Sequence, residues 1–509
     1  MDKTYAIISP AGGFKEDMPG ILIDDLYTPG SPSINVLFKY GAISKVKGRK
    51  KHISTQVPDG EEINLLHNFI QTSGNEFFIA GTKSKIYNWD GTEWVDITGE
   101  LIFSGDDTDF WSFTNYGDYF LFTNGKDDVY KWSGTGNIGT LSGAPLGRFI
   151  VNFKNYVVIG QLSNYPNRIA WSSVGEMENW TGGDSGEAII DDSERIMGFA
   201  KTTDYLVIFK QRAIYLLRYV GGDIPFTVDK RVERIGCYSP FSIVVLNNRV
   251  YFFGANKRIY MFDGIEAHNI SEPIAQTLDN IREPNFPLIY GYTLENLNQV
   301  FWLIPEGDTE RCNKIIMYDA EKNTWFKFEF EGNVMASGEY LDETSKTWAW
   351  YLNNEPDTSW EDIQAQGIIW NDIYYTIQGD RASILGHPDG YVYRLFSTPT
   401  DKDSDFEGVF VSKKIPFGNI ENYKRILFIR HIFKKQDRSN TVKISVRLDD
   451  GLDFQDEREF ELFSDSKDEL VFLDHWCDYV AKTLQLKISS YDFFDYVGSI
   501  FYYLDYYIL

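Results

Sequence analysis

Residues Val250 to Gly264, VYFFGANKRIYMFDG, carry the pattern that decides the fold. The apolar run VYFF is followed by the turn residues GAN, and a second apolar run, IYMF, ends at the turn residues DG. Two short runs of aromatic and β-branched residues separated by Gly and Asn are typical of a β-hairpin. The stretch therefore predicts two antiparallel strands joined by a tight turn.

Similar hairpins recur along the chain. Each has an aromatic residue in its second strand, and aligning on that residue gives Tyr87, Tyr130, Trp171, Tyr215 and Tyr260. The steps between them are 43, 41, 44 and 45 residues, and looser copies follow around Tyr318 and Tyr393. A repeat of about 40 to 50 residues with several strands in each is the spacing of β-propeller blades.

Physical reasons favour a propeller over the alternatives. One small sheet cannot bury both of its faces, whereas sheets stacked around an axis bury them and leave only short edges. A β-sandwich would not repeat the same hairpin, and a β-helix would repeat at roughly 20 to 30 residues. The sequence thus predicts an all-β protein with a propeller of about six to eight blades, seven being favoured, over residues 61–400.

The flanks of the repeats differ from them. Residues 1–60 contain five prolines and several Gly-Gly or Pro-Gly turns, so we expect an N-terminal arm. The period breaks after Asp319, which predicts an insertion around residues 320–384. Beyond a polar linker at residues 400–405, runs such as VKISVRL from Val442 alternate strictly. Residues 401–509 are therefore expected to form a β-sandwich-like domain, and the final run FYYLDYYIL from Phe501 is too aromatic to remain in water, so we expect it to dock on another surface.

The composition excludes several classes of protein. The chain has 509 residues, with 49 Lys and Arg against 74 Asp and Glu, which gives a formal net charge of −25. Such a surface repels nucleic acid on average, and its simplest explanation is solubility. The three cysteines are widely spaced, and the N-terminus lacks a basic region followed by an apolar core. We expect a protein of a reducing cytoplasm, without a disulfide framework and without membrane insertion.

Motifs of catalysis and of metal binding do not stand out. The chain lacks G-x-S-x-G, H-E-x-x-H and phosphate-binding loop patterns, and its six histidines are scattered singly. Asp401, Asp403 and Asp405 resemble the start of a calcium loop, but Phe406 and Ser412 stand where the EF-hand pattern requires Gly and Glu. The sequence therefore predicts no catalytic residue, no cofactor, no metal site and no enzymatic activity.

Basic residues are segregated in one short segment of this acidic chain. Residues 39–52 hold six basic side chains and no acidic one. The residues proposed to contact an acidic partner or a phosphate backbone are Lys45, Lys47, Arg49, Lys50 and Lys51. A solvated loop is the alternative. In a second basic segment, residues 424–438, the run from Arg425 to Arg430 is interpreted as a buried strand with charged ends, and a solvated edge is the favoured alternative.

The N-terminal segment also carries a resemblance to a known family. Gly12-Gly13-Phe14, Pro19, Asn35-Val36, Gly41 and Arg49 resemble the opening of tail nozzle (tail hub) proteins of short-tailed bacteriophages. The segment IGCYSPFS from Ile235, followed by the hairpin at Val250, is similar to a blade of the packaged-DNA stabilisation proteins of the same tails.

The resemblance implies a structural virion protein without enzymatic activity, assembled in the host cytoplasm. Copies would form a ring, a hexamer, below the portal and its adaptor, in contact with tail fibre or spike proteins. The ring would extend the channel for double-stranded DNA, retain the genome and release it on ejection. An acidic lumen would repel the DNA backbone, so that the genome slides without sticking.

A carbohydrate-binding or carbohydrate-cleaving propeller that recognises a host surface is the competing hypothesis, because propellers can place carboxylates on an aromatic-rich face. A fibrous receptor-binding protein is less well supported, since the chain has no collagen-like or heptad repeat.

Overall fold

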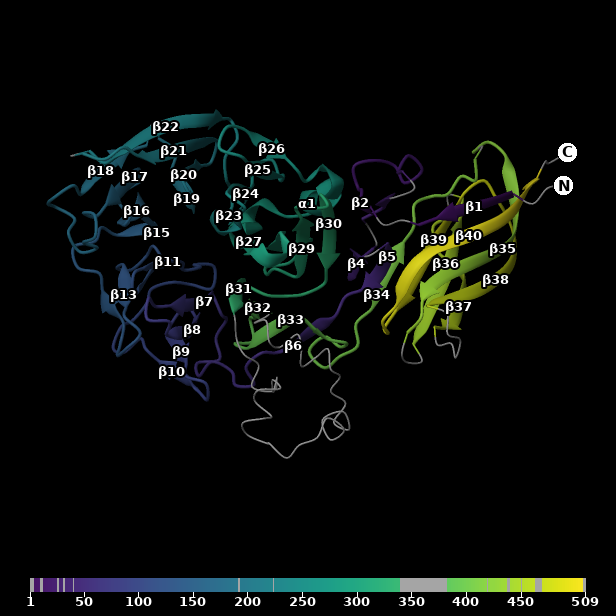
Figure 1. The fold of residues 1–509 in the computed structure, drawn as a ribbon, viewed down its shortest axis with the longest axis horizontal. Coiled ribbons are helices and arrows are strands. Elements are labelled where there is room, and N and C mark those ends of the chain that lie inside the picture. The colour runs from purple at the N-terminus through teal and green to yellow at the C-terminus, as the bar shows by residue number, and fades with distance from the viewer. Residues whose placement is uncertain are drawn as a thin grey trace.

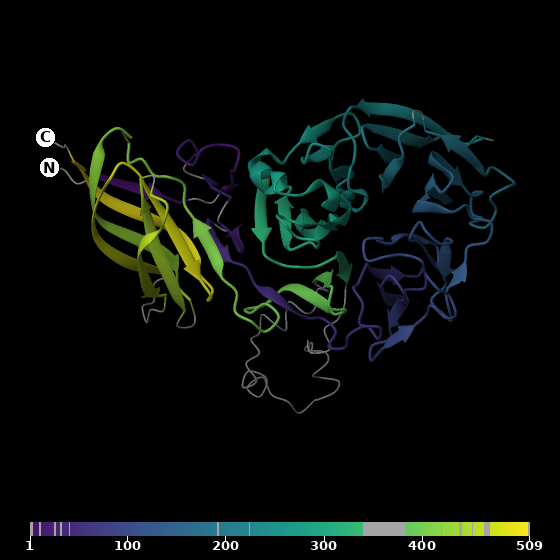
Figure 2. The ribbon, with the colours of Figure 1, turned by 180° about the vertical axis from the view of Figure 1, so that it is seen from behind.

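The computed structural model describes residues 4–9, 12–24, 27–30, 33–39, 41–190, 193–222, 224–338, 382–418, 420–436, 440–449, 451–462 and 469–506. Almost all regular structure in these residues is β-strand, with one short α-helix, α1 (Ala275–Asp279), and four 3-10 helices, η1 (Pro240–Ser242), η2 (Glu272–Ile274), η3 (Glu283–Leu288) and η4 (Glu295–Leu297). A larger domain of sheets arranged around a centre lies beside a smaller one, and both ends of the chain lie at the far side of the smaller domain (Figures 1 and 2).

Six four-stranded antiparallel sheets of the larger domain follow the chain in order. The first contains β7 (Leu65–Ile70), β8 (Glu76–Gly81), β9 (Ile86–Trp89) and β10 (Trp94–Asp96); the second β11 (Ser112–Tyr116), β12 (Tyr119–Thr123), β13 (Tyr130–Trp132) and β14 (Gly139–Thr140); the third β15 (Gly147–Phe153), β16 (Tyr156–Leu162), β17 (Tyr165–Trp171) and β18 (Gly186–Ile189). The fourth contains β19 (Ile196–Lys201), β20 (Tyr205–Lys210), β21 (Ala213–Tyr219) and β22 (Phe226–Glu233); the fifth β23 (Val244–Leu246), β24 (Arg249–Phe253), β25 (Ile259–Phe262) and β26 (Ala267–Asn269); the sixth β27 (Tyr290–Leu294), β28 (Gln299–Ile304), β29 (Lys314–Asp319) and β30 (Thr324–Phe328).

The seventh sheet is assembled from distant parts of the chain. It contains β31 (Val334–Gly338), β32 (Ala382–Gly386), β33 (Val392–Thr398) and, from the N-terminal segment, β6 (Gly48–Lys51). Tyr393 on β33 pairs with Lys51, and Arg394 pairs with Lys50. A strand from near the start of the chain thus completes the last sheet.

The first strands of these sheets touch one another in a closed ring. β11 contacts β15, and the contacts continue through β19, β23 and β27 to β31, which returns to β7. His67 on β7 joins Asn115 on β11 through a 2.9 Å hydrogen bond. This arrangement is a β-propeller, as predicted. The number of blades in the whole chain stays a prediction, because residues 339–381, between β31 and β32, lie outside the described residues.

The aromatic residues used for the alignment occupy one structural position. They lie on the third strand of every sheet: Tyr87, Tyr130, Trp171, Tyr215, Tyr260, Tyr318 and Tyr393 on β9, β13, β17, β21, β25, β29 and β33. The opening hairpin is β24 and β25, with Val250 paired to Phe262 and Phe253 to Ile259. All four side chains are buried, which explains why this apolar pattern repeats once per sheet.

The smaller domain packs two sheets face to face. The six-stranded sheet has the order β38 (Leu470–Ala481), β35 (Tyr423–Lys434), β40 (Asp495–Tyr506), β5 (Ala42–Lys45) and β4 (Val36–Lys39), with β1 (Thr4–Ile8) also paired to β40. The second sheet has the order β34 (Gly408–Val411), β39 (Leu484–Ser490), β36 (Thr441–Leu448) and β37 (Gln455–Glu461). Ile429 and Phe501 from one sheet and Ile444 and Leu486 from the other belong to one buried cluster, so the predicted sandwich is present.

The N-terminal segment differs from the arm expected over residues 1–60. Its strands β1, β4 and β5 belong to the sandwich and β6 belongs to the propeller, while β2 (Gly13–Phe14) and β3 (Tyr27–Thr28) pair with each other. Proline and glycine do break this segment into short pieces, but each piece finds a strand partner far along the chain. The insertion is expected around residues 320–384, but β30 and β31 are regular strands of the propeller, and residues 339–381 lie outside the described residues.

Candidate functional site

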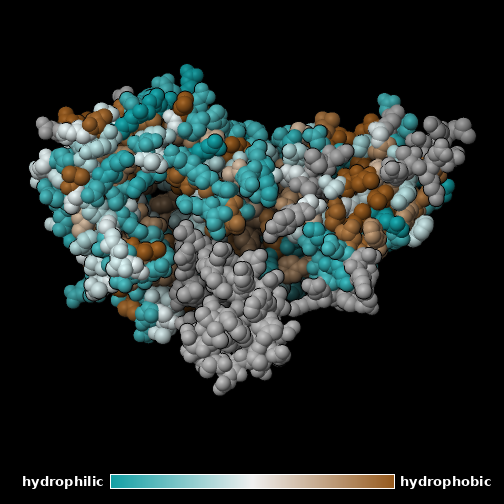
Figure 3. All heavy atoms as spheres, viewed as in Figure 1, coloured by the Kyte–Doolittle hydropathy of each residue, from teal (hydrophilic) through white to brown (hydrophobic). Residues whose placement is uncertain are grey.

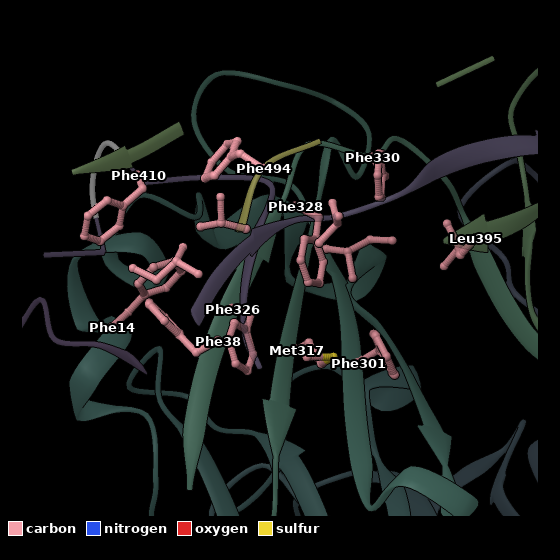
Figure 4. Close-up of a cluster of buried hydrophobic side chains, with 14 of the residues drawn as sticks. Phe14, Phe38, Phe301, Met317, Phe326, Phe328, Phe330, Leu395, Phe410 and Phe494 are labelled. Carbon is pink, nitrogen blue, oxygen red and sulfur yellow. The ribbon is translucent and has the colours of Figure 1, made fainter. Parts of the chain in front are cut away.

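The N-terminal segment forms a seam between the propeller and the sandwich. Phe14 from β2 and Phe38 from β4 pack on Phe326 of β30, with ring centroids 6.3 and 5.6 Å from that of Phe326 (Figure 4). Phe14 and Phe38 also meet edge to face at 5.6 Å. Each such aromatic pair contributes about 1 kcal/mol beyond its buried area. The seam is therefore a packed core rather than a flexible hinge.

Asn35 ties the seam together through its backbone and its side chain. Its N–H donates to the carbonyl of Lys327 at 3.0 Å, and its Oδ1 accepts from the N–H of Glu329 at 2.8 Å. Its Nδ2 donates to the carbonyl of Glu407 at 2.9 Å. The residue has φ +60°, a conformation that Asn adopts more readily than most residues. One amide side chain thus bridges β30 and the start of the sandwich.

A buried polar network lies beside this bridge. The carboxylate of Glu16 accepts from the N–H of Thr277 at 2.9 Å and from its hydroxyl at 3.0 Å. The Nζ of Lys327 donates to the same hydroxyl at 3.1 Å and lies 3.7 Å from Glu16 Oε1. All three residues are buried. Their charges are therefore compensated by one another rather than by water. The network fixes the N-terminal segment against α1.

Arg49, farther along the N-terminal segment, also joins the seam. Its guanidinium holds the carboxylate of Asp401 by two bonds, 2.6 and 2.7 Å long, and donates to the carbonyl of Glu331 at 2.5 Å. Its side chain is 4% exposed and lies 5.0 Å from the ring centroid of Phe330. Asp401, considered above for calcium, is therefore engaged by an arginine.

The structure divides the five predicted contact residues into two groups. Lys45 and Arg49 are buried, and burial lowers the pKa of Lys45, whose Nζ donates to the carbonyl of Tyr491. Lys50 and Lys51 are exposed on β6, the outer strand of the seventh sheet, and Lys47 is exposed directly before it. Contact with a partner is thus open to these three, whereas Lys45 and Arg49 hold the fold. The sequence signal, a basic run, could not separate the two groups.

Aromatic side chains from opposite sides of the ring of sheets meet inside the propeller. The rings of Phe110 and Phe241 lie 5.4 Å apart, Phe110 and Tyr290 5.7 Å apart, and Phe241 stacks on Tyr290 at 6.3 Å. Phe110 is 2% exposed. Burial raises the pKa of the Tyr290 hydroxyl, so this group stays protonated and uncharged. These three rings, the aromatic plug, connect the second sheet with the fifth and sixth.

Cavities lie around this plug. One of about 430 Å³ is lined by the first strands of the sheets, including His67 and Tyr292. Burial lowers the pKa of His67 to about 4, so its imidazole is neutral at pH 7. A second cavity, of about 420 Å³, is formed by loops, and its polar lining includes Glu62, Arg311 and Asn333. Figure 3 shows the surface hollowed over the propeller.

The loop cavity carries an ion pair of its own. The guanidinium of Arg311 contacts the carboxylate of Glu62, which also accepts from Asn333 Nδ2 at 3.1 Å. Asp107 and Glu310 line the same cavity. Acids, an amide and a guanidinium could bind the hydroxyl groups of a small polar ligand. Sequence reasoning missed these residues because they come from four separate loops.

Metal chemistry finds no support in the part of the chain that is described. No group of three or more His, Cys, Asp or Glu residues there is arranged to hold a metal ion. The three cysteines are not joined by disulfides, and burial raises the pKa of each thiol, to about 12 for Cys237. Among the described helices, none has the length and apolar character needed to cross a membrane.

Comparisons with known proteins add little beyond the fold. No family model and no curated protein matches the chain. Among solved structures it is similar to the WD40 domain of Neurospora crassa Pan2, at 11% identity, covering 71% of this chain and 98% of that chain, with a TM-score of 0.40. It is also similar to a chain of the mitotic checkpoint complex, at 9% identity, covering 70% of this chain and 95% of that chain, with a TM-score of 0.39. Apo AztD from Citrobacter koseri matches at 13% identity, covering 53% of this chain and 87% of that chain, with a TM-score of 0.30. These values carry no argument about function.

Proposed function

We propose that the chain is a structural subunit of the tail nozzle of a short-tailed bacteriophage. In this role it forms a ring below the portal and its adaptor, extends the DNA channel and retains the packaged genome until ejection. Tail fibre or spike proteins bind around the ring. The subunit works as a wall, with no catalytic step.

The seam is the observation that carries this proposal. The residues that resemble the opening of nozzle proteins lie in it: Gly13 and Phe14 beside β30, Asn35 across both domains, and Arg49 on Asp401. A channel wall under the pressure of packaged DNA must not hinge between its domains. A segment that fastens propeller to sandwich meets this requirement, and it gives these particular residues a common purpose.

Two further observations agree with the proposal. The aromatic plug connects opposite sides of one propeller, and in this proposal the DNA runs between copies, which is what a ring provides. The net charge of −25 disfavours adhesion of DNA to the wall. The exposed Lys47, Lys50 and Lys51 then offer a local basic contact for the adaptor or for the end of the DNA.

Electron microscopy of the particle that contains this chain is the direct test. We expect density for the propeller and the sandwich in a ring on the tail axis, below the portal. Finding the chain in a peripheral fibre would overturn the proposal.

Charge reversal gives a second test. The triple variant Lys47→Glu, Lys50→Glu and Lys51→Glu should assemble poorly on DNA-filled heads while remaining folded. A control is Lys230→Glu and Lys257→Glu, with one lysine on β22 and one in the turn between β24 and β25, which should assemble normally. Normal assembly of the triple variant would remove the basic contact from the proposal.

The loop cavity supports a second candidate, a carbohydrate-binding propeller. Its volume of about 420 Å³ and its acidic and amide lining suit a small polar ligand. A glycan array separates the two hypotheses, because a nozzle subunit should bind no glycan. Binding that is lost in Glu62→Gln and Arg311→Ala, but kept in the exposed-pair control Lys131→Ala, would favour the carbohydrate hypothesis.

A further inference from the structure

The outer face of the six-stranded sheet of the sandwich is exposed and largely apolar. Its cross-strand pairs run Trp476–Phe428–Tyr502 in one row and Asp474–Arg430–Ile500–Ile7 in the next, from β38 through β35 and β40 to β1. Trp476 is 68% exposed, Ile7 59% and Phe472 52%. Figure 3 shows hydrophobic side chains gathered over the smaller domain.

Aromatic rings on this face are already ordered for a contact. Phe428 lies 4.5 Å from Trp476 and 5.1 Å from Tyr502, measured between ring centroids. Rings that support one another lose little side-chain entropy when a partner covers them. Trp, Tyr and Arg are also the residues that dominate binding energy at protein interfaces.

The charges at the centre of the face cancel in pairs. Arg430 binds Asp474 at 2.8 and 3.0 Å, and Arg425 binds Asp478 at 2.6 and 2.8 Å. The whole chain carries −25, so two copies repel each other on average. A neutral face is where such copies can approach without that cost. A basic partner would instead be recognised by unpaired acidic groups.

The size of the face suits a stable contact. β38, β35 and β40 each have 12 residues, so they span roughly 40 Å by 15 Å, or about 600 Å². A standard interface buries about 800 Å² on each partner, and β1 extends the face toward that value. In the described residues β38 is also an edge strand, paired only with β35.

We propose that this face binds a second copy of the chain and is the contact through which copies associate. The pairing itself does not depend on the nozzle hypothesis; only the assembly of copies into a closed ring, which needs a further contact besides this pair, rests on that proposed function. The apolar rings are covered by the neighbouring copy, and the two Arg–Asp pairs keep the buried contact neutral.

Sedimentation velocity of the purified full chain tests the proposal over a range of concentration and salt. We expect association that Trp476→Asp and Phe472→Asp each weaken by at least ~30-fold. Added salt should strengthen it, because salt screens the repulsion between acidic copies. The control Leu452→Asp changes a 91% exposed residue between β36 and β37 and should have no effect.

The milder variants Trp476→Ser and Phe472→Ser serve where the aspartates lower the melting temperature. A wild-type chain that stays monomeric at all concentrations would overturn the proposal. So would association that the four face variants leave unchanged, or a monomer that binds a glycan through this face. If copies associate through this face but the chain is absent from the tail axis, this inference stands and the nozzle hypothesis is wrong. If the chain forms a ring on the tail axis that the face variants leave intact, the nozzle hypothesis stands and this inference is wrong.

Discussion

The six consecutive sheets of the propeller and the seam beside them are built in opposite ways. Each consecutive sheet is made of neighbouring strands joined by short turns, as in the hairpin from Val250, where paired residues are at most 12 positions apart. The seam joins residues that are hundreds of positions apart, such as Arg49 and Asp401, separated by 352. The comparison teaches that repeated local units supply the blades, while the two ends of the chain supply closure and domain attachment.

The largest expected effect comes from breaking the seam at Arg49. Arg49→Ala leaves Asp401 without its partner in a mostly buried position, which should lower the free energy of unfolding by about 3 kcal/mol. The control Lys131→Ala removes a more exposed pair with Glu178 in the second sheet and should cost less than about 1 kcal/mol. Denaturant midpoints followed by tryptophan fluorescence measure both. Equal small shifts would mean that Arg49 does not fasten the domains.

Acid should destabilise the sandwich through two buried histidines. Burial, and then the neighbouring His475, lower the pKa of His431 to about 3, and burial also lowers the pKa of His475. The unfolded imidazole has a pKa of about 6.5, so the unfolded state takes up protons first as the pH falls. The stability that comes from keeping His431 neutral is therefore fully present above about pH 6.5 and is lost as the pH falls. His431 alone should lower the free energy of unfolding by about 2 kcal/mol at pH 5.

The measurement is the free energy of unfolding against pH for wild type and His431→Gln. The variant should reduce the slope between pH 6 and pH 4 by up to about 1.4 kcal/mol per pH unit. The two rings lie 5.7 Å apart between the sheets of the sandwich, so the stability that His431 loses in acid belongs to that domain. An unchanged slope would show that His431 does not titrate as inferred.

A smaller effect is expected at Gly13. Its φ of +111° disfavours any side chain, and an added Cβ would lie 3.0 Å from Thr324 Cγ2. Gly13→Ala should cost about 1 to 2 kcal/mol. Gly91 in the first sheet has a similar φ of +102° with open space around it, so Gly91→Ala should cost about 1 kcal/mol. A larger loss at Gly91 than at Gly13 would argue against the close approach in the seam.

The smallest effect is expected at Lys47, which is exposed beside the buried Arg49. Lys47→Glu should change the free energy of unfolding by no more than about 0.5 kcal/mol. Thermal melts of this variant and Arg49→Ala would therefore separate the two parts of the basic segment. A large destabilisation by Lys47→Glu would assign it to the seam as well.

Sequence reasoning recovered some of these features and missed others for clear physical reasons. The position of Tyr393 marked the third strand of the seventh sheet, although that sheet is closed by β6. The basic run pointed to residues 45–51, yet burial separates Lys45 and Arg49 from the three exposed lysines. A composition signal reports which residues are charged, and only packing decides which charges meet solvent.

The sequence by itself determined the all-β class, the propeller repeat and the alternating strands β36 and β39. These features rest on periodicities that every strand carries locally, because a side chain faces the core or the solvent at fixed spacing. Tertiary structure alone decided that β6 closes the propeller, that β1 pairs with β40, and that Phe14 packs on Phe326. Such pairings depend on which distant edges remain open once the local sheets have formed, and no local pattern encodes that choice.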